Sequence, residues 1–189
     1  VSLFNASGSF SASGCGIFWI NHLIRRFGLG HWCVHVDMDE ALIFPGIESG
    51  RRLTDFVRYL DQAGFGCTAG IMIDIVPEGF PRHANNHLVA SDFSDCQFID
   101  PKVLRMPCEF PPYSFAKGGV RSRITGQSLL MTKSPLVRPD RNFAYLVNNH
   151  YHTHLPVADV STGVLHYKFI GAFRNRIQEA IESREHFQG

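Results

Sequence analysis

The chain has 189 residues, of which 44% are hydrophobic and 19% are charged, and this composition is typical of a single globular domain. Lysine and arginine number 18 against 17 for aspartate and glutamate, which gives a formal net charge of +1. Nucleic-acid-binding domains are usually strongly basic, so we expect no nucleic-acid partner. No stretch of the sequence is long and apolar enough to cross a bilayer, so we expect no transmembrane segment and at most peripheral membrane contact.

The cysteines bear on the compartment of the protein. There are five of them, an odd number, and no two form a C-x-x-C pair. No secretion signal is visible near the first residue. These features favour reduced thiols in a cytoplasmic protein.

Helical and extended patterns alternate in the first half of the chain. Apolar residues recur at three- and four-residue spacing over residues 14–27 and 51–63, and each stretch is followed by a glycine, so we expect two helices there. Short runs rich in β-branched residues predict buried strands over residues 32–37 and 67–76. The dipeptide Pro45-Gly46 predicts a turn between these elements.

The second half has shorter elements. Residues 80–118 contain five prolines and no clear periodicity, so we expect a long loop. Short strands are predicted over residues 120–124, 129–137, 143–147 and 163–169, and a helix over residues 171–185. The whole order predicts an α/β fold in which helices flank a mixed, mainly parallel central sheet.

Three acids lie directly after the first expected strand: Asp37, Asp39 and Glu40. In open α/β sheets, ligands bind beyond the carboxyl ends of strands. Carboxylates this close repel one another unless a cation or hydrogen-bond donors offset their charge. Two carboxylates two residues apart can hold Mg²⁺ or Mn²⁺, which can also bridge the phosphates of a substrate. The alternative is a solvated acidic turn between two strands.

The residues around these acids resemble the D-x-D-E segment of bacterial glycosyltransferase family 2-like proteins, which have the GT-A fold. The similarity continues in order along most of the chain, at residues 8–10, 19–21, 32–46, 73–79, 118–121, 133–137 and 165–169. The resemblance implies a metal-dependent sugar transferase. Such an enzyme uses a nucleotide-sugar donor and a glycan or other hydroxyl acceptor, and its acidic motif holds a divalent cation, Mn²⁺ or Mg²⁺, on the donor diphosphate.

Individual roles follow from the resemblance. Asp39 would bind the metal directly, and Asp37 would contact the donor ribose or reach the metal through water. Glu40 belongs to the same motif and would contribute to donor binding. His166 matches a late histidine that completes the metal site, although a histidine hydrogen-bonded in the interior is the simpler interpretation of that position. His150 falls on a recurrent histidine of the family and is expected to bind substrate.

The expected reaction requires further groups. Negative charge accumulates on the departing nucleoside diphosphate, and basic side chains can stabilise it. The candidates are Arg121, Arg138 and Lys168, each of which could equally be a solvated surface cation. The acceptor hydroxyl needs a base, and Asp74 and Glu78 are the acids best placed by sequence, ahead of Asp92 and Asp95. The alternative for Asp74 is a turn-capping acid.

Two other functions remain open. His150, His152 and His154 alternate and would share one side of a strand, as ligands of a zinc site do. They suggest a zinc-dependent hydrolase or a metal-binding module. The third hypothesis is a non-catalytic remnant that keeps the fold and binds a glycan or a partner.

The length also bears on the expected activity. GT-A enzymes place a βαβ region that holds the nucleotide base before the acidic motif, whereas only 36 residues precede Asp37 here. We therefore expect residues 1–189 to form one glycosyltransferase-like domain that is truncated at its N-terminus. Such a chain would bind a nucleotide-sugar weakly and transfer little sugar by itself.

Overall fold

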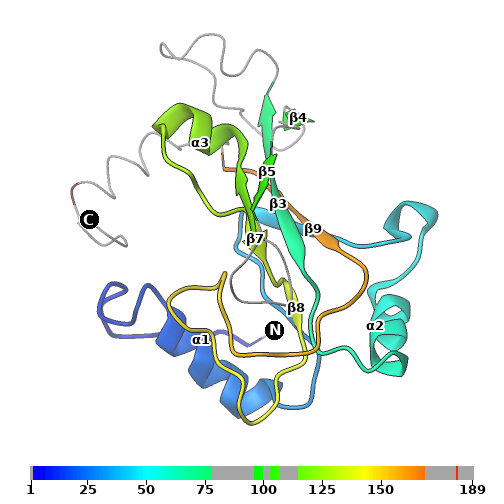
Figure 1. Ribbon diagram of the computed structural model, residues 1–189. Coiled ribbons are helices and arrows are strands. Elements are labelled where there is room, and N and C mark those ends of the chain that lie inside the picture. The colour runs from blue at the N-terminus through cyan, green and yellow to red at the C-terminus, as the bar shows by residue number, and fades with distance from the viewer. Residues whose placement is uncertain (1, 78–95, 100–102, 107–114, 169–181, 183–189) are drawn as a thin grey trace.

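Helices and strands are interleaved along the computed structural model, which describes residues 2–77, 96–99, 103–106, 115–168 and 182 (Figure 1). In chain order the elements are α1 (Ile17–Leu23), the π-helical turn η1 (Ile24–Gly28), β1 (Cys33–Val34), β2 (Glu40–Ile43), the 3-10 turn η2 (Ile47–Ser49), α2 (Leu53–Gln62), β3 (Gly70–Pro77), β4 (Cys96–Ile99), β5 (Val103–Met106), β6 (Phe115–Gly118), α3 (Gly119–Thr125), β7 (Thr132–Lys133), β8 (Leu136–Val137) and β9 (Thr162–His166).

A five-stranded mixed sheet forms the centre of the fold. Its strand order is β2-β9-β3-β4, and β7 also pairs with β3. The expected α/β class with a mixed sheet is confirmed, but the expectation of a mainly parallel sheet is wrong for the described strands. Only β3 and β9 are parallel, and the other named pairings are antiparallel. The helix α2 links β2 to β3, yet β9 lies between these two strands and runs antiparallel to β2, so α2 does not join neighbouring parallel strands.

One glycine allows β9 to fit between its neighbours. Gly163 pairs with Ile43 of β2 on one side and Ile71 of β3 on the other. A β-carbon at Gly163 would lie only 2.6 Å from Cγ1 of Ile43, so no larger residue fits there without displacement. The absence of a side chain therefore makes room for the side chain of Ile43.

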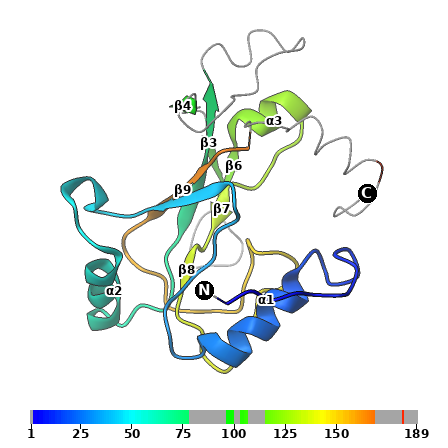
Figure 2. The same cartoon turned by 180° about the vertical axis from the view of Figure 1, so that it is seen from behind.

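Helices α1 and α2 cover the lower end of the molecule in Figure 1, whereas α3 lies at the opposite end in both views (Figures 1 and 2). Ile17 of α1 and Ile24 of η1 are buried in a cluster that includes Tyr145. Phe56 and Leu60 of α2 are buried in a second cluster that includes Leu136 of β8. Both predicted amphipathic helices are thus confirmed, and each begins two or three residues later than predicted.

The largest local difference from the sequence prediction is α3. The strand expected over residues 120–124 is wrong, because these residues are helical. Gly118 and Gly119 have φ angles of 125° and 76°, which turn the chain out of β6 and into the helix, and Gly126 ends it with a φ of 72°. Val120 is buried in this helix. The β-branched residue that suggested a strand therefore packs α3 against the rest of the protein.

Other strand predictions need adjustment. The strand expected over residues 129–137 is divided into β7 and β8 by Ser134 and Pro135. The strand expected over residues 143–147 is reduced to a single bridge between Tyr145 and His152. The expected loop at 80–118 contains β4, β5 and β6. The helix predicted over residues 171–185 lies outside the described residues, except for Glu182.

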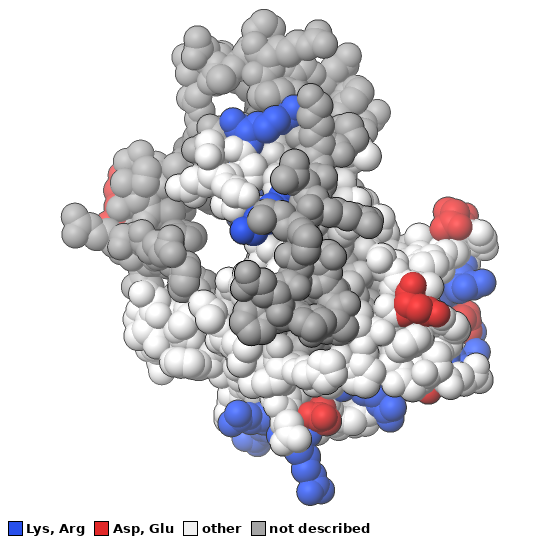
Figure 3. All heavy atoms as spheres, viewed as in Figure 1, with Lys and Arg blue, Asp and Glu red and all other residues white. Residues whose placement is uncertain are grey.

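Charged side chains on α2 form local ion pairs. Asp55 contacts both Arg52 and Arg58, and Figure 3 shows acidic and basic side chains side by side at the right-hand edge, where α2 lies. Within the described part of the chain, no helix combines the length and the apolar character needed to cross a membrane.

Candidate functional site

Glu40, His166 and Asp74 lie in one row across β2, β9 and β3. Glu40 pairs with His166, and His166 pairs with Asp74. Because paired residues on neighbouring strands project to the same face of a sheet, the three polar side chains share one face. The structure therefore brings together an acid, a histidine and a second acid that are far apart in the sequence.

The acidic motif reaches this row from a direction that the sequence analysis did not expect. The strand predicted over residues 32–37 is reduced to β1, and Asp37 and Asp39 lie in or beside a turn that precedes β2. Since β2 is antiparallel to β9, the first residue of β2 lies beside the last residue of β9. The acids consequently reach the carboxyl end of β9 even though they do not follow a strand of their own.

Asp74 is the most buried member of the site, with a side chain that is 0% exposed. Its Oδ1 accepts hydrogen bonds from Nδ1 of His166 at 2.8 Å and from Nε of Arg121 at 2.9 Å. Burial by itself raises the pKa of Asp74, but the hydrogen bond from His166 and the positive charge of Arg121 outweigh it, so the pKa lies below its usual value. A buried carboxylate with a lowered pKa and two occupied contacts is a poor proton acceptor. This geometry disagrees with the prediction that Asp74 is the catalytic base.

The hydrogen bond to Asp74 defines the chemistry of His166. The ring donates from Nδ1, so in the neutral imidazole Nε2 carries the lone pair. Nε2 lies 3.8 Å from Oδ2 of Asp39, and Nζ of Lys168 lies 3.6 Å from the same oxygen. The backbone N–H of Tyr167 donates to the carbonyl of Asp39 at 2.8 Å, which fixes the turn against the end of β9. Asp39, His166 and Lys168 thus converge at the carboxyl end of β9.

Lys133, for which the sequence pattern predicted no role, forms a buried ion pair with Glu40. Both side chains are 1% exposed, and Nζ of Lys133 lies 2.5 Å from Oε2 of Glu40. The same ammonium lies 3.7 Å from Oδ2 of Asp37, and the backbone N–H of Asp37 donates to Oε2 of Glu40. Lys133 therefore offsets the repulsion within the acidic motif. The signal in the sequence was a single charged residue inside the apolar run of residues 129–137.

Asp37 is directed differently from Asp39. Its side chain is 55% exposed and its described ion pair is with Lys133 rather than with the groups around His166. Its contribution within the described structure is to the turn that positions Asp39.

The alternating histidines do not form a zinc site within the described residues, where no three His, Cys, Asp or Glu side chains come close enough to hold a metal ion together. His150 and His152 lie in a loop rather than on a strand. His152 has both ring nitrogens engaged, by the carbonyl of Thr153 and by Oγ of Ser134. His154 is exposed. The geometry thus gives no support to the zinc alternative.

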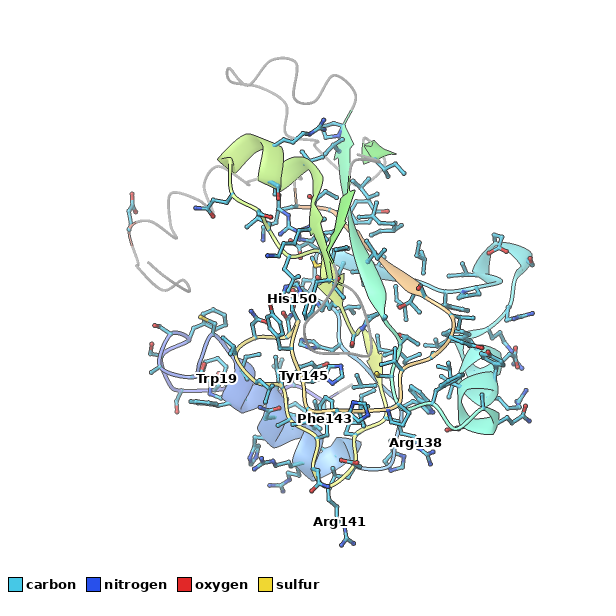
Figure 4. The ribbon with its side chains drawn as sticks, viewed as in Figure 1. Trp19, Arg138, Arg141, Phe143, Tyr145 and His150 are labelled. Atoms are coloured by element: carbon cyan, nitrogen blue, oxygen red, sulfur yellow. The ribbon has the colours of Figure 1, made fainter. Side chains whose placement is uncertain are left out.

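Arg138 lies apart from the site, and three of the candidate acids lie outside the described residues. Arg138 pairs with Asp61 at 3.1 Å and donates to the carbonyl of Gly30. Figure 4 shows it at the lower edge of the molecule, away from His150. Arg138 is therefore a surface cation, which was its alternative interpretation. Glu78 lies outside the described residues, as do Asp92 and Asp95.

Arg121 is at the site, but its Nε is bound to Asp74, and its Nη2 approaches the sulfur of Met131. It thus contributes first to holding Asp74 in place.

Comparison of the chain with protein-family models, curated protein sequences and solved structures gives no match. The function must therefore be inferred from the chemistry of the site.

Proposed function

We propose that the chain is a metal-dependent, glycosyltransferase-like domain that transfers a sugar from a nucleotide-sugar donor to a hydroxyl acceptor. The observation that carries this proposal is the convergence of Asp39, His166 and Lys168 at the carboxyl end of β9. The carboxylate of Asp39 and the imidazole nitrogen of His166 suit a divalent cation, and the ammonium group of Lys168 suits the phosphates that such a cation binds. The GT-A-like character of the fold is part of the same proposal, and it rests on the resemblance described above.

The residues present fit a Mn²⁺ or Mg²⁺ ion held jointly with a substrate. Two ligand atoms on one such cation lie about 3 Å apart, because each is about 2.1 Å from the metal. Oδ2 of Asp39 and Nε2 of His166 are 3.8 Å apart, so a small side-chain rotation would bring them to that separation. Magnesium sites commonly take one or two protein ligands and complete the shell with phosphate oxygens and water. A pair of ligands, rather than a cage of four, is therefore the arrangement that such chemistry needs.

The divalent cation would stabilise the negative charge that develops on the diphosphate as it leaves the sugar. Lys168 would act on the same charge, because its side chain is 40% exposed and its ammonium already lies beside Asp39. Asp74 would hold His166 with Nε2 directed at Asp39. Lys133 and Glu40 would keep the acidic turn in place when no ligand is bound.

A thermal-unfolding experiment tests the proposal. Mn²⁺ together with UDP, GDP, ADP or CDP should raise the melting temperature of the chain more than either component alone. The variant Asp39→Asn should remove this joint effect, because it removes the charged ligand and keeps the shape. The matched control is Asp140→Asn, an exposed aspartate elsewhere on the chain, which should behave as the parent.

Three outcomes are informative. A joint shift that Asp39→Asn removes supports the metal and nucleotide site. No shift with any of these nucleotides and either Mn²⁺ or Mg²⁺ contradicts the proposal. A nucleotide-dependent shift that is the same without metal and in Asp39→Asn would place the nucleotide elsewhere and also contradict it.

A further inference from the structure

His150 has a ring whose hydrogen bonding determines its tautomer. It follows Asn148, whose side-chain oxygen accepts the backbone N–H of His150 at 2.9 Å. Nδ1 of the ring lies 2.6 Å from the carbonyl oxygen of Thr132. A carbonyl oxygen can only accept, so Nδ1 donates the hydrogen and Nε2 of the neutral ring carries the lone pair. Within the described part of the chain, Nε2 has no hydrogen-bond partner.

The surroundings of His150 connect it to the acidic site. Thr132 is directly followed in β7 by Lys133, whose ammonium binds Glu40. Figure 4 places His150 between α3 and the ring of Tyr145, beside the sheet. The charged groups that act on its ring are Lys133 of β7, Arg121 of α3 and Glu40 of β2. All three belong to the network around the row of Glu40, His166 and Asp74.

The same environment keeps the ring neutral. Burial is the largest effect and lowers the pKa of His150; the charges of Lys133 and Arg121 lower it further, against the opposing effects of the Thr132 carbonyl and Glu40. The pKa therefore lies below its usual value of 6.5. Near neutral pH, His150 presents an unprotonated nitrogen.

Several other candidate proton acceptors of the described structure are held by hydrogen bonds or ion pairs. Oδ1 of Asp74 is occupied by His166 and Arg121, and Oε2 of Glu40 by Lys133 and the backbone of Asp37. Oε1 of Glu40 is buried without a hydrogen-bond partner in the described structure, beside the ammonium of Lys133 that pairs with the same carboxylate. His152 has both nitrogens bound. His150 thus combines a fixed tautomer with an available lone pair. His166 shares the first property, but its Nε2 faces Asp39 and is assigned above to the metal.

We propose that His150 is the general base of the transfer reaction, with Nε2 accepting the proton of the acceptor hydroxyl. This inference rests on the function proposed above and names the catalytic residue that the acids do not supply. In the step, the acceptor oxygen loses its proton to Nε2 and forms a bond to the anomeric carbon. The bond from that carbon to the phosphate oxygen breaks, and its electron pair leaves with the nucleoside diphosphate. The base regains its resting state when the imidazolium releases the proton to water.

The first experiment needs no variant and no turnover. Diethyl pyrocarbonate modifies unprotonated, accessible imidazole nitrogens, and peptide mass spectrometry locates the product. At neutral pH, His150 should be modified readily, whereas His152 should react slowly because both nitrogens are bound. Mn²⁺ with UDP-glucose or GDP-mannose should protect His150 and leave the exposed His154 reactive. An unreactive His150, or one that bound donor does not protect, would overturn the inference.

The second experiment separates this inference from the proposed function. The variant His150→Gln should retain the Mn²⁺ and nucleotide thermal shift but lose about 100-fold or more of the sugar transfer to an added sugar alcohol such as glycerol. His154→Gln is the matched control and should resemble the parent. If His150→Gln binds and transfers as the parent does, the base is another group, while the proposed function stands. If the parent shows no joint metal and nucleotide binding at all, the proposed function fails and the role of His150 fails with it.

Discussion

Asp74 on β3 and His166 on β9 are paired residues on parallel strands, and they are also joined by a 2.8 Å hydrogen bond between Oδ1 and Nδ1. The backbone register thus brings the two side chains together, and the side-chain contact then fixes the ring. Carboxylate–histidine pairs of this kind are a common support for metal-binding imidazoles, because they set the tautomer and the ring orientation. Asp74 is consequently a positioning residue for His166.

The first prediction concerns this pair. Asp74→Asn leaves Arg121 without its carboxylate and allows an amide group to face Nδ1 of His166, so we expect a loss of about 3 kcal/mol in the free energy of unfolding. Urea denaturation measures that loss. Long-range ¹H–¹⁵N spectra should show a change in the tautomer of His166, which a purely structural role for Asp74 would not require. Asp55→Asn on α2 is the control, because its ion pairs are on the surface and contribute little.

A second prediction concerns the buried ion pair between Lys133 and Glu40. Lys133→Met leaves Glu40 buried without its counter-ion, so we expect a loss of about 3 to 5 kcal/mol in the free energy of unfolding. The double variant Lys133→Met with Glu40→Gln removes both charges and should recover most of the loss. Chemical denaturation of the two single variants and the double variant completes the cycle. Simple additivity would contradict a direct coupling of the two residues.

A third prediction compares two glycines of α3. Gly119 and Gly126 both have positive φ angles, 76° and 72°. A β-carbon at Gly119 would also lie 2.8 Å from Cε of Met131 and 3.0 Å from Oδ2 of Asp74, whereas one at Gly126 would meet open space. Gly126→Ala should cost about 1 kcal/mol for the backbone conformation alone. Gly119→Ala should cost clearly more and should weaken Mn²⁺ binding, and equal losses of stability would contradict the close contact with Asp74.

The fourth prediction is a pH dependence of stability. Burial, followed by the charge of Lys133, lowers the pKa of His35 from 6.5 to about 4. Between these two values the unfolded chain binds the proton more readily than the folded chain, so stability falls as the pH is lowered from about 6.5 to about 4. The contribution is complete above this window, and its size is about 3 kcal/mol at most.

The test of this pH dependence is His35→Phe, which preserves a ring against Tyr145 and removes the titrating nitrogen. It also removes Nδ1, which is buried without a hydrogen-bond partner in the described structure. Thermal melts across the window should show a shallower pH dependence for the variant than for the parent. The slope should not vanish, since the pKa values of His150 and His152 are also lowered by burial. Superimposable curves would show that His35 does not titrate as described.

The periodic parts of the sequence predicted the local structure well. Helix α2 lies within the stretch where apolar spacing indicated it, and strands β3 and β9 overlap their predicted stretches to within a residue at one end, because each element buries apolar residues at the expected spacing. The pattern failed at residues 120–124, because a pattern of only five residues cannot distinguish a helix from a strand. Two consecutive glycines, Gly118 and Gly119, turn the chain into a helix there. Strand direction also escaped prediction, since nothing local indicates that β9 lies between β2 and β3.

The site was predictable where single residues carried chemistry and unpredictable where it depended on pairing. The acidic motif drew attention to Asp39, and the resemblance drew attention to His166, but their 3.8 Å approach depends on the register of β2 against β9. The role of a base that was expected for Asp74 does not suit its contacts, which the sequence could not indicate because its two partners come from β9 and α3. Lys133 was overlooked as a participant, because a lysine within an apolar run becomes informative only when its counter-ion is known.

Gly163, the second residue of β9, has an effect well beyond its own position. Sliding β9 by one residue would place Thr162 or Val164 opposite Ile43, where the space for a side chain is lacking. Either slip would turn every side chain of the strand to the other face of the sheet. It would put Leu165 or Tyr167 opposite Glu40, in the row now completed by His166. The lack of a side chain at Gly163 therefore favours the observed register of β9 over the two slipped registers. The observed register in turn determines the face of the sheet on which the imidazole of His166 lies.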